Sequence, residues 1–248
     1  MRGALISAAA GAALLLFPAL AVADDGGDLS AKELAQQAKD NFLKAKSVHL
    51  GYTDHSKGTA ADRTKAVAMD LSLDRDGNCA GSLTMGKGGG SVELVKRGHE
   101  VWMKPDADFW KAQVPGPQGA AVAELFKDRY VHGTTADAML KGMADTCDLA
   151  AFQRQVDSGV ADGKALTKGE ETTRDGTKVI PLKGREDGKD NVLYVTSGSP
   201  HQLVEAAQKG AGTDLDLTFA DYDKPVPSTT PPADKTVEVD RLNQQLGG

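Results

Sequence analysis

The sequence has few aromatic residues, few cysteines and no basic cluster, and each shortage excludes a class of function. Aromatic side chains make up 5% of the 248 residues, too few to provide stacking platforms for single-stranded nucleic acid. The formal net charge is -6 and no stripe of Lys or Arg occurs, which argues against binding to phosphate backbones. With 40% hydrophobic and 26% charged residues, the composition is that of a soluble globular protein. We therefore expect no nucleic-acid partner.

Motifs of catalysis, nucleotide binding and metal binding are also missing. The chain has no GxSxG elbow, no SxxK pair and no HExxH. Residues 81–88, GSLTMGKG, nearly match a phosphate-binding loop, but Gly88 replaces its hydroxyl residue and a strand is expected to follow instead of a helix. The turn at 74–78 has its glycine at the fourth position, where a calcium loop requires the sixth. We expect a non-enzymatic protein without cofactor or metal.

The N-terminus has the pattern of an export signal. Arg2 precedes an apolar segment over 4–17, and the sequence Ala21-Val22-Ala23 fits cleavage before Asp24. We predict a signal peptide over 1–23 and a flexible leader over 24–29, which indicates an extracytoplasmic protein, secreted or in the cell envelope. An uncleaved anchor is the alternative, because the segment is just long enough to span a bilayer. No cysteine lies near this junction, so the chain has no lipobox for lipid attachment.

The two cysteines, Cys79 and Cys147, both belong to the exported part of the chain. An even cysteine count in an oxidising compartment favours a disulfide, which would tie a strand region to a helical region. The alternative is two unpaired thiols.

Strand patterns fill two parts of the chain. In the first part, Met69, Leu71 and Leu73 alternate with polar residues, which is the period of a strand with one face on a core. Strands are predicted at 48–52, 64–74, 78–86, 90–97 and 99–104, and again near 164–173, 177–183, 191–196, 202–208 and 214–221. Turn pairs such as Asp76-Gly77, Asp175-Gly176 and Asp187-Gly188 separate several of them.

Helical patterns fill the remainder. Ser30 and Glu33 form a predicted capping box at the start of the first helix. Residues 105–152 show apolar residues at helical spacing, including a helix capped by Thr134 or Thr135, and 57–62 reads as a polar loop. The proline-rich segment 224–232 is expected to run extended along an edge, before a short strand at 237–239 or a helix over 240–246. The fold class predicted is α+β, a single domain over 30–248 with a curved antiparallel half-barrel sheet wrapped over α-helices.

A sheet covered by helices can enclose an apolar cavity. Methionines suit the lining of such a cavity because they adapt to variable apolar partners. The cavity-lining candidates are Met69, Leu71, Met85, Val101 and Met103 on the sheet and Leu125, Met139, Leu140 and Met143 on the helices. A shift of one residue in strand register would turn each sheet candidate to the other face.

Several phrases of the sequence, together with the order of elements, carry a family resemblance. They are the segment 41–46, GNCAGSLTMGKGGGSVELVKRGHEVWMKPDADFW over 77–110, and FADYDKPVPSTTPP over 219–232. With these, the chain resembles the LolA/LppX-LprG-like bacterial lipoprotein and lipid-carrier superfamily, in particular its small secreted actinobacterial members.

The resemblance implies a hydrophobic cavity that shelters a lipid or other apolar ligand, in a monomer that contacts a membrane surface only transiently. Many relatives are tethered through a lipobox cysteine, whereas this chain has Ala23 and Asp24 at the junction. The resemblance therefore implies a released carrier of lipid or acyl chains. The alternative is a cell-envelope structural or protein-interaction module that has the same fold and a filled core.

Overall fold

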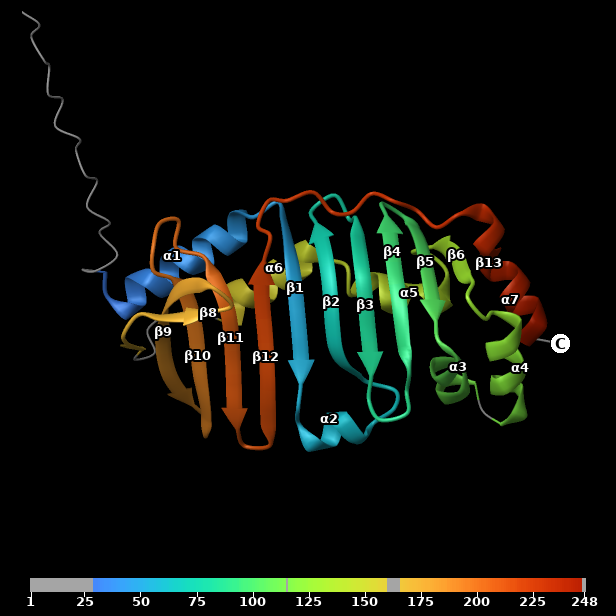
Figure 1. Ribbon diagram of the computed structural model, residues 1–248, viewed down its shortest axis with the longest axis horizontal. Helices are drawn as coiled ribbons and strands as arrows, with labels where there is room; N and C mark the ends of the chain where they lie inside the picture. Colours follow the sequence, from blue (N-terminus) through green and yellow to red (C-terminus); the bar gives the residue numbers. More distant parts are fainter. Residues whose placement is uncertain (1–28, 115, 160–165, 247–248) are drawn as a thin grey trace, which may run out of the picture.

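The structure is a computed structural model that describes residues 29–114, 116–159 and 166–246. The predicted signal peptide and the leader up to residue 28 lie outside the described residues. The described strands form one open, curved sheet, and helices lie behind it (Figure 1). The predicted α+β half-barrel is confirmed.

Helices and strands alternate in groups along the described part of the chain. The helices are α1 Ala31–Lys44, α2 Lys57–Ala61, α3 Ala107–Gln113, α4 Pro117–Leu125, α5 Ala138–Asp145, α6 Leu149–Gly159 and α7 Val239–Leu246. The strands are β1 Ser47–Asp54, β2 Ala66–Asp74, β3 Cys79–Met85, β4 Ser91–Arg97, β5 Glu100–Pro105, β6 Tyr130–Thr134, β7 Thr167–Lys168, β8 Thr172–Arg174, β9 Thr177–Glu186, β10 Lys189–Thr196, β11 Leu203–Gly210, β12 Thr213–Ala220 and β13 Thr236–Glu238.

The order of strands across the sheet joins the two predicted strand series through one central pair. The order is β13-β6-β5-β4-β3-β2-β1-β12-β11-β10-β9-β7, and β8 also pairs with β9. Because β1 pairs with β12, a strand near the start of the chain lies beside one near its end. The strands predicted over 48–104 and 177–221 are confirmed, with boundaries that differ by at most three residues. Two predicted turns, Asp175-Gly176 and Asp187-Gly188, have positive φ at both residues, as a tight hairpin turn requires.

Three predictions about the type or extent of elements are wrong. The region 105–152 contains β6 as well as helices, and 57–61 forms the short helix α2 in place of a loop. In β6 only Val131 and Gly133 face inward, and since glycine has no side chain the alternation does not show. The predicted strand near 164–173 is divided into β7 and β8, and residues 160–165 lie outside the described part. The sheet is antiparallel except for β13 on β6, which is a parallel pair.

A side-chain cap begins helix α1, whereas helix α5 begins without one. At α1 the predicted capping box is confirmed, since Ser30 Oγ accepts from the Glu33 amide at 3.3 Å and Glu33 Oε2 accepts from the Ser30 amide at 2.8 Å. At α5 the predicted threonine cap is wrong, because Asp137 is the residue before the helix. Its carboxylate accepts instead from the amide and hydroxyl of Thr134, at 2.6 and 3.0 Å.

A continuous set of buried side chains lies between the sheet and helices α1, α5 and α6, and we call it the apolar layer. Its fully buried members include Phe42 from α1, Leu140 from α5 and Leu149 from α6. The predicted disulfide is confirmed: Cys79 on β3 is bonded to Cys147, between α5 and α6, with 5.6 Å between the Cα atoms. The disulfide thus joins the helical layer to the sheet.

Candidate ligand-binding face

The structure brings most of the cavity candidates together, but as packed core. Leu71, Met85, Val101, Met103 and Leu140 are all buried members of the apolar layer. Helix α5 packs on β5 and β6, and the disulfide reaches β3 at the same end of the sheet. This end of the layer is therefore closed by protein side chains.

The remaining four candidates lie at the margin of the layer or outside it. Met69, Met139 and Met143 are partly buried and pack against the core. Leu125 is 50% exposed, so the prediction that it faces the interior is wrong. Val122 of helix α4 and Phe126 directly after the helix are buried, whereas Leu125, the last residue of the helix, is largely exposed.

Strand pairing near the middle of the sheet shows where the cover of the helices ends. On the face toward the helices, which we call the concave face, Leu71, Leu50 and Phe219 are direct neighbours on β2, β1 and β12, and all three are buried. Two residues further along each strand, the neighbours are Met69, Tyr52 and Leu217, and these are only partly buried.

This second line of neighbours continues to β10. Leu217 pairs with Ala206 on β11, which pairs with Leu193 on β10. We call Met69, Tyr52, Leu217, Ala206 and Leu193 the concave row. All five side chains are partly buried, although they share a face with the core. The strand neighbours at the two ends of the concave row, Leu83 and Leu182, are buried. The concave row is thus an incompletely covered apolar strip between two closed ends.

Helix α6 contributes apolar side chains at the border of this strip, beside helix α1, which packs on β10 and β11. Phe152 and Val156, four residues apart on one side of the helix, are partly buried against the core. The ring centroids of Phe152 and Phe219 are 6.2 Å apart, and both rings contact Phe42 of α1 at 5.8 and 5.3 Å. Because Leu217 lies two residues before Phe219 on the same face, the aromatic cluster marks the deep border of the concave row.

Polar side chains form the opposite border. One step beyond the concave row, the neighbouring residues are Asp54, Leu215, Gln208 and Asn191, so this line is polar except at Leu215. Gln208 donates to Asn191 Oδ1 at 2.8 Å and accepts from Lys189 Nζ at 3.3 Å. We call Asp54, Gln208, Asn191 and Lys189 the polar rim. A gradient from aromatic cluster to apolar strip to polar rim suits an amphiphilic ligand better than a purely apolar one.

The charge of the rim follows from its hydrogen bonds. Burial acts to raise the pKa of Asp54, but hydrogen bonds from Ser56, Thr59 and Tyr52 outweigh it, so the pKa is lowered and the carboxylate is ionised at neutral pH. Burial, together with the charge of Asp54, raises the pKa of Tyr52, whose hydroxyl therefore remains a donor. The rim offers one carboxylate, one ammonium and two amides, and the phenol of Tyr52 in the concave row lies beside them.

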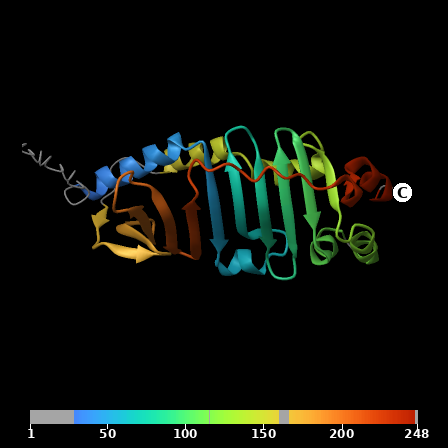
Figure 2. The same cartoon turned by 45° about the horizontal axis from the view of Figure 1, so that its top comes forward.

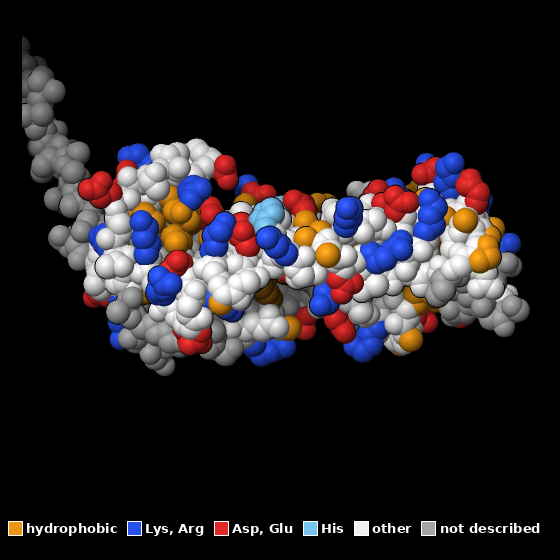
Figure 3. Space-filling model, turned by 90° about the horizontal axis from the view of Figure 1, so that it is seen from below, with side chains coloured by type: hydrophobic (Ala, Val, Ile, Leu, Met, Phe, Trp, Pro, Cys, Tyr) orange, Lys and Arg blue, Asp and Glu red, His pale blue; other side chains and the backbone are white. Residues whose placement is uncertain are grey.

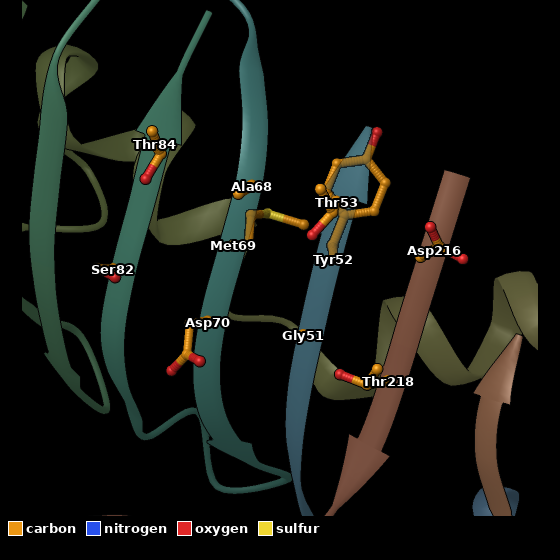
Figure 4. A pocket seen from close by; sticks show the side chains of 10 residues that line it. All are labelled: Gly51, Tyr52, Thr53, Ala68, Met69, Asp70, Ser82, Thr84, Asp216 and Thr218. Atoms are coloured by element: carbon orange, nitrogen blue, oxygen red, sulfur yellow. The ribbon is translucent and has the colours of Figure 1, made fainter. Parts of the chain in front are cut away.

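The other face of the sheet, which we call the convex face, is polar. A pocket of about 290 Å³ lies over Gly51 and is lined mainly by hydroxyls and carboxylates, among them Thr53, Asp70 and Asp216 (Figure 4). Thr218 points toward Gly51, where a Cβ atom would lie 2.2 Å from its hydroxyl oxygen. Viewed from the lower edge, charges of both signs are interspersed and hydrophobic side chains appear in small groups (Figure 3). The lower edge therefore resembles an ordinary solvated surface.

Within the described residues, no group of three or more His, Cys, Asp or Glu side chains is placed to hold a metal ion. Nor is any helix in the described part long and apolar enough to cross a bilayer. The five histidines are scattered: His201 is buried on the Thr196 carbonyl at 2.9 Å, while His49 and His55 lie beside carboxylates at 3.4 and 4.0 Å. The cluster that sequence reasoning missed surrounds His132, where two glutamates from separate strands converge.

The architecture defines a class, an open curved half-barrel over helices, and solved structures of that class exist. The crystal structure of LprF from Mycobacterium bovis aligns with a TM-score of 0.54 and 14% identity, over 81% of this chain and 96% of LprF. The lipoprotein LppX from Mycobacterium tuberculosis gives 0.48 and 14%, over 80% and 98%. A LolA superfamily protein from Nitrosomonas europaea gives 0.25 and 10%, over 80% and 96%. The chain thus has the fold of LprF, and at this identity the likeness concerns the fold alone. No family model and no curated protein matches the sequence.

Proposed function

We propose that this protein is an exported, non-enzymatic carrier that binds the acyl chain of a lipid between the concave row and helix α6. The observation that carries the proposal is the concave row itself, five neighbouring apolar side chains that the helices cover only in part. Each CH₂ group moved from water into this strip contributes about 0.8 kcal/mol. The likeness to LprF supports the fold, and the signal pattern over 1–23 supports export by cleavage near Ala23.

The proposed site differs from the one predicted from the sequence. Of the nine candidates, only Met69 belongs to the concave row, and the five buried ones form the closed end of the apolar layer. The polar rim would hold the headgroup of the ligand, with Lys189 and Asp54 as its charged contacts. We place the protein in the LolA/LppX-LprG-like superfamily as part of this proposal, acting as a monomer that meets membranes transiently.

A matched pair of substitutions tests the site. Leu193→Asp places a carboxylate in the concave row, whereas Val192→Asp places it on the convex face, where the paired residue is Lys183. We expect the wild type and Val192→Asp to take up a fluorescent fatty acid, and Leu193→Asp to lose most of this uptake. Circular dichroism and thermal unfolding confirm that both variants fold.

Native mass spectrometry after gentle purification provides a second readout. A wild-type protein that is always empty and never takes up the fatty acid would favour the alternative, an envelope module with a filled core. The closed packing of β2 to β5 is the observation on which that alternative depends. Equal uptake by the two variants would place the ligand away from the concave row.

A further inference from the structure

The C-terminal segment crosses about half of the sheet, from β12 in the middle to β13 at one edge. After β12 ends at Ala220, the chain runs without helix or strand as far as a short 3-10 turn at Ala233–Lys235. It passes over the upper ends of β1 to β5 to reach β13, instead of following an edge as predicted (Figures 1 and 2). Its start is fastened to β1, since the Ser47 hydroxyl donates to the Lys224 carbonyl at 2.6 Å.

Its far end closes the apolar layer at β6. Only three residues of β13 pair with β6, yet Val237 and Val239 are 8% and 5% exposed. A Cβ atom on Gly133 of β6 would lie 2.8 Å from Leu140 Cδ1 and 2.9 Å from Val239 Cγ1. Leu140 of α5 and Val239 of α7 therefore meet over Gly133. We call β13 and α7 together the end plug.

One side chain on the convex face fastens the plug to its neighbours. His132 of β6 lies between two carboxylates, with Nε2 2.6 Å from Glu100 Oε2 and Nδ1 3.0 Å from Glu238 Oε1. Its ring is stacked on Trp102 at 4.6 Å, and its side chain is 19% exposed. Only the protonated imidazole has N–H donors on both nitrogens, so loss of the proton leaves one carboxylate facing a lone pair.

The surroundings determine how His132 responds to pH. Burial acts to lower its pKa, but the hydrogen bonds to Glu238 and Glu100 outweigh it, and the pKa is raised. The nearby cations on the same face have other partners: Lys104 of β5 pairs with Glu93, and Arg97 of β4 donates to the Lys96 carbonyl at 2.9 Å. The contribution to stability is therefore complete below about pH 6.5 and is lost as pH rises through the raised value.

We propose that the end plug separates from β6 when His132 loses its proton, which opens the β6 end of the apolar layer. That a lipid enters through this opening rests on the proposed function. The separation of the end plug from β6 does not depend on a ligand. We call His132, Glu100 and Glu238 the clamp. The clamp is closed in mildly acidic conditions and opens as the surroundings become alkaline.

Amide hydrogen exchange in the ligand-free protein tests the release. Protection of residues 236–246 is compared with that of β3 in the same molecule, with exchange times corrected for intrinsic rates, between about pH 6 and about pH 9. We expect the plug to lose protection several-fold relative to β3 in the wild type. NMR of the imidazole ring, assigned with His132→Gln, gives the pH at which His132 titrates.

Three variants distinguish opening of the clamp from a loss of stability in the whole protein. His132→Gln should show low plug protection that no longer depends on pH, and Glu238→Gln should show a weaker pH response. His99→Gln, at the turn before β5, should behave as the wild type. The proposal is overturned if the plug follows β3 at every pH while His132 titrates, or if His132→Gln keeps full protection. If the protein takes up fatty acid while the end plug stays protected at every pH, only this inference is overturned. If the end plug separates with rising pH but the protein takes up no fatty acid, only the proposed function is overturned.

Discussion

The side-chain amide of Gln153 donates a 2.9 Å hydrogen bond to the backbone carbonyl of Phe42, which joins helix α6 to the last turn of helix α1. The same amide donates to the carbonyl of Ala45 at 3.0 Å. The Phe42 carbonyl also accepts from the Ala45 amide at 3.2 Å, so the buried Gln153 adds a second donor there and bonds the Ala45 carbonyl as well. This contact holds α6 beside α1 and thereby positions Phe152 over the concave row.

We therefore expect Gln153→Leu to lower the free energy of unfolding by about 1–3 kcal/mol, the cost of leaving buried polar groups unsatisfied. Urea unfolding followed by circular dichroism measures the change. Gln118→Leu, on the exposed surface of α4, is the matched control and should change stability by less than about 0.5 kcal/mol. Equal effects of the two substitutions would contradict the role of Gln153.

Leu140 and Leu125 offer a second comparison, because both were predicted to line the interior and the structure separates them. Leu140 is fully buried under the end plug, and Leu125 is largely exposed. Leu140→Ala should cost about 2–5 kcal/mol of unfolding free energy, because it removes apolar contacts and leaves a cavity. Leu125→Ala should cost less than about 0.5 kcal/mol. The same urea experiment decides, and a large loss for Leu125→Ala would show that the exposed leucine contributes to packing.

Local patterns were sufficient to predict the strands and the cover of helices. Alternation at Leu215, Leu217 and Phe219 depends only on which face of a strand is apolar, and the Asp-Gly turns depend only on two residues each. Elements whose pattern is short or incomplete were missed. In β6, Gly133 leaves room for Val239, more than 100 residues later, so the reason for the glycine lies in the tertiary structure.

The sequence predicts the type of the candidate site but not its position on the sheet. An apolar face beneath helices follows from the sequence, and Met69, one of the predicted cavity residues, packs against the core on that face. Which part of the face stays uncovered depends on where α6 lies, and Gln153 fixes that position through a contact 111 residues distant. The His132 clamp joins residues on β5, β6 and β13, and no spacing in the sequence brings them together.

The disulfide gives a third prediction. Cys79 and Cys147 enclose a loop of 68 residues, for which the chain-entropy model estimates about 4 kcal/mol of stabilisation. Both cysteines are fully buried, so a reductant should act only after the protein opens. We expect the reduced protein, or a Cys79→Ser/Cys147→Ser double variant, to unfold at clearly lower urea concentration than the oxidised protein. Coincident unfolding curves would show that the bond does not constrain the unfolded chain.

Acid titration of the polar rim gives the last prediction. The lowered pKa of Asp54 means that its ionised form is favoured in the folded state, so its contribution to stability is present above the unfolded value of about 3.9 and is lost as pH falls through the folded value. Asp54→Asn should therefore lose less stability than the wild type between about pH 6 and about pH 3. Urea midpoints across this range measure the difference.

Asp76→Asn, in the exposed turn between β2 and β3, is the control and should follow the wild type, because the carboxylate of Asp76 has no comparable set of donors among the described residues. If Asp54→Asn also follows the wild type, folding does not favour the ionised form of Asp54, and the hydrogen bonds from Ser56 and Tyr52 contribute no stability that depends on its charge.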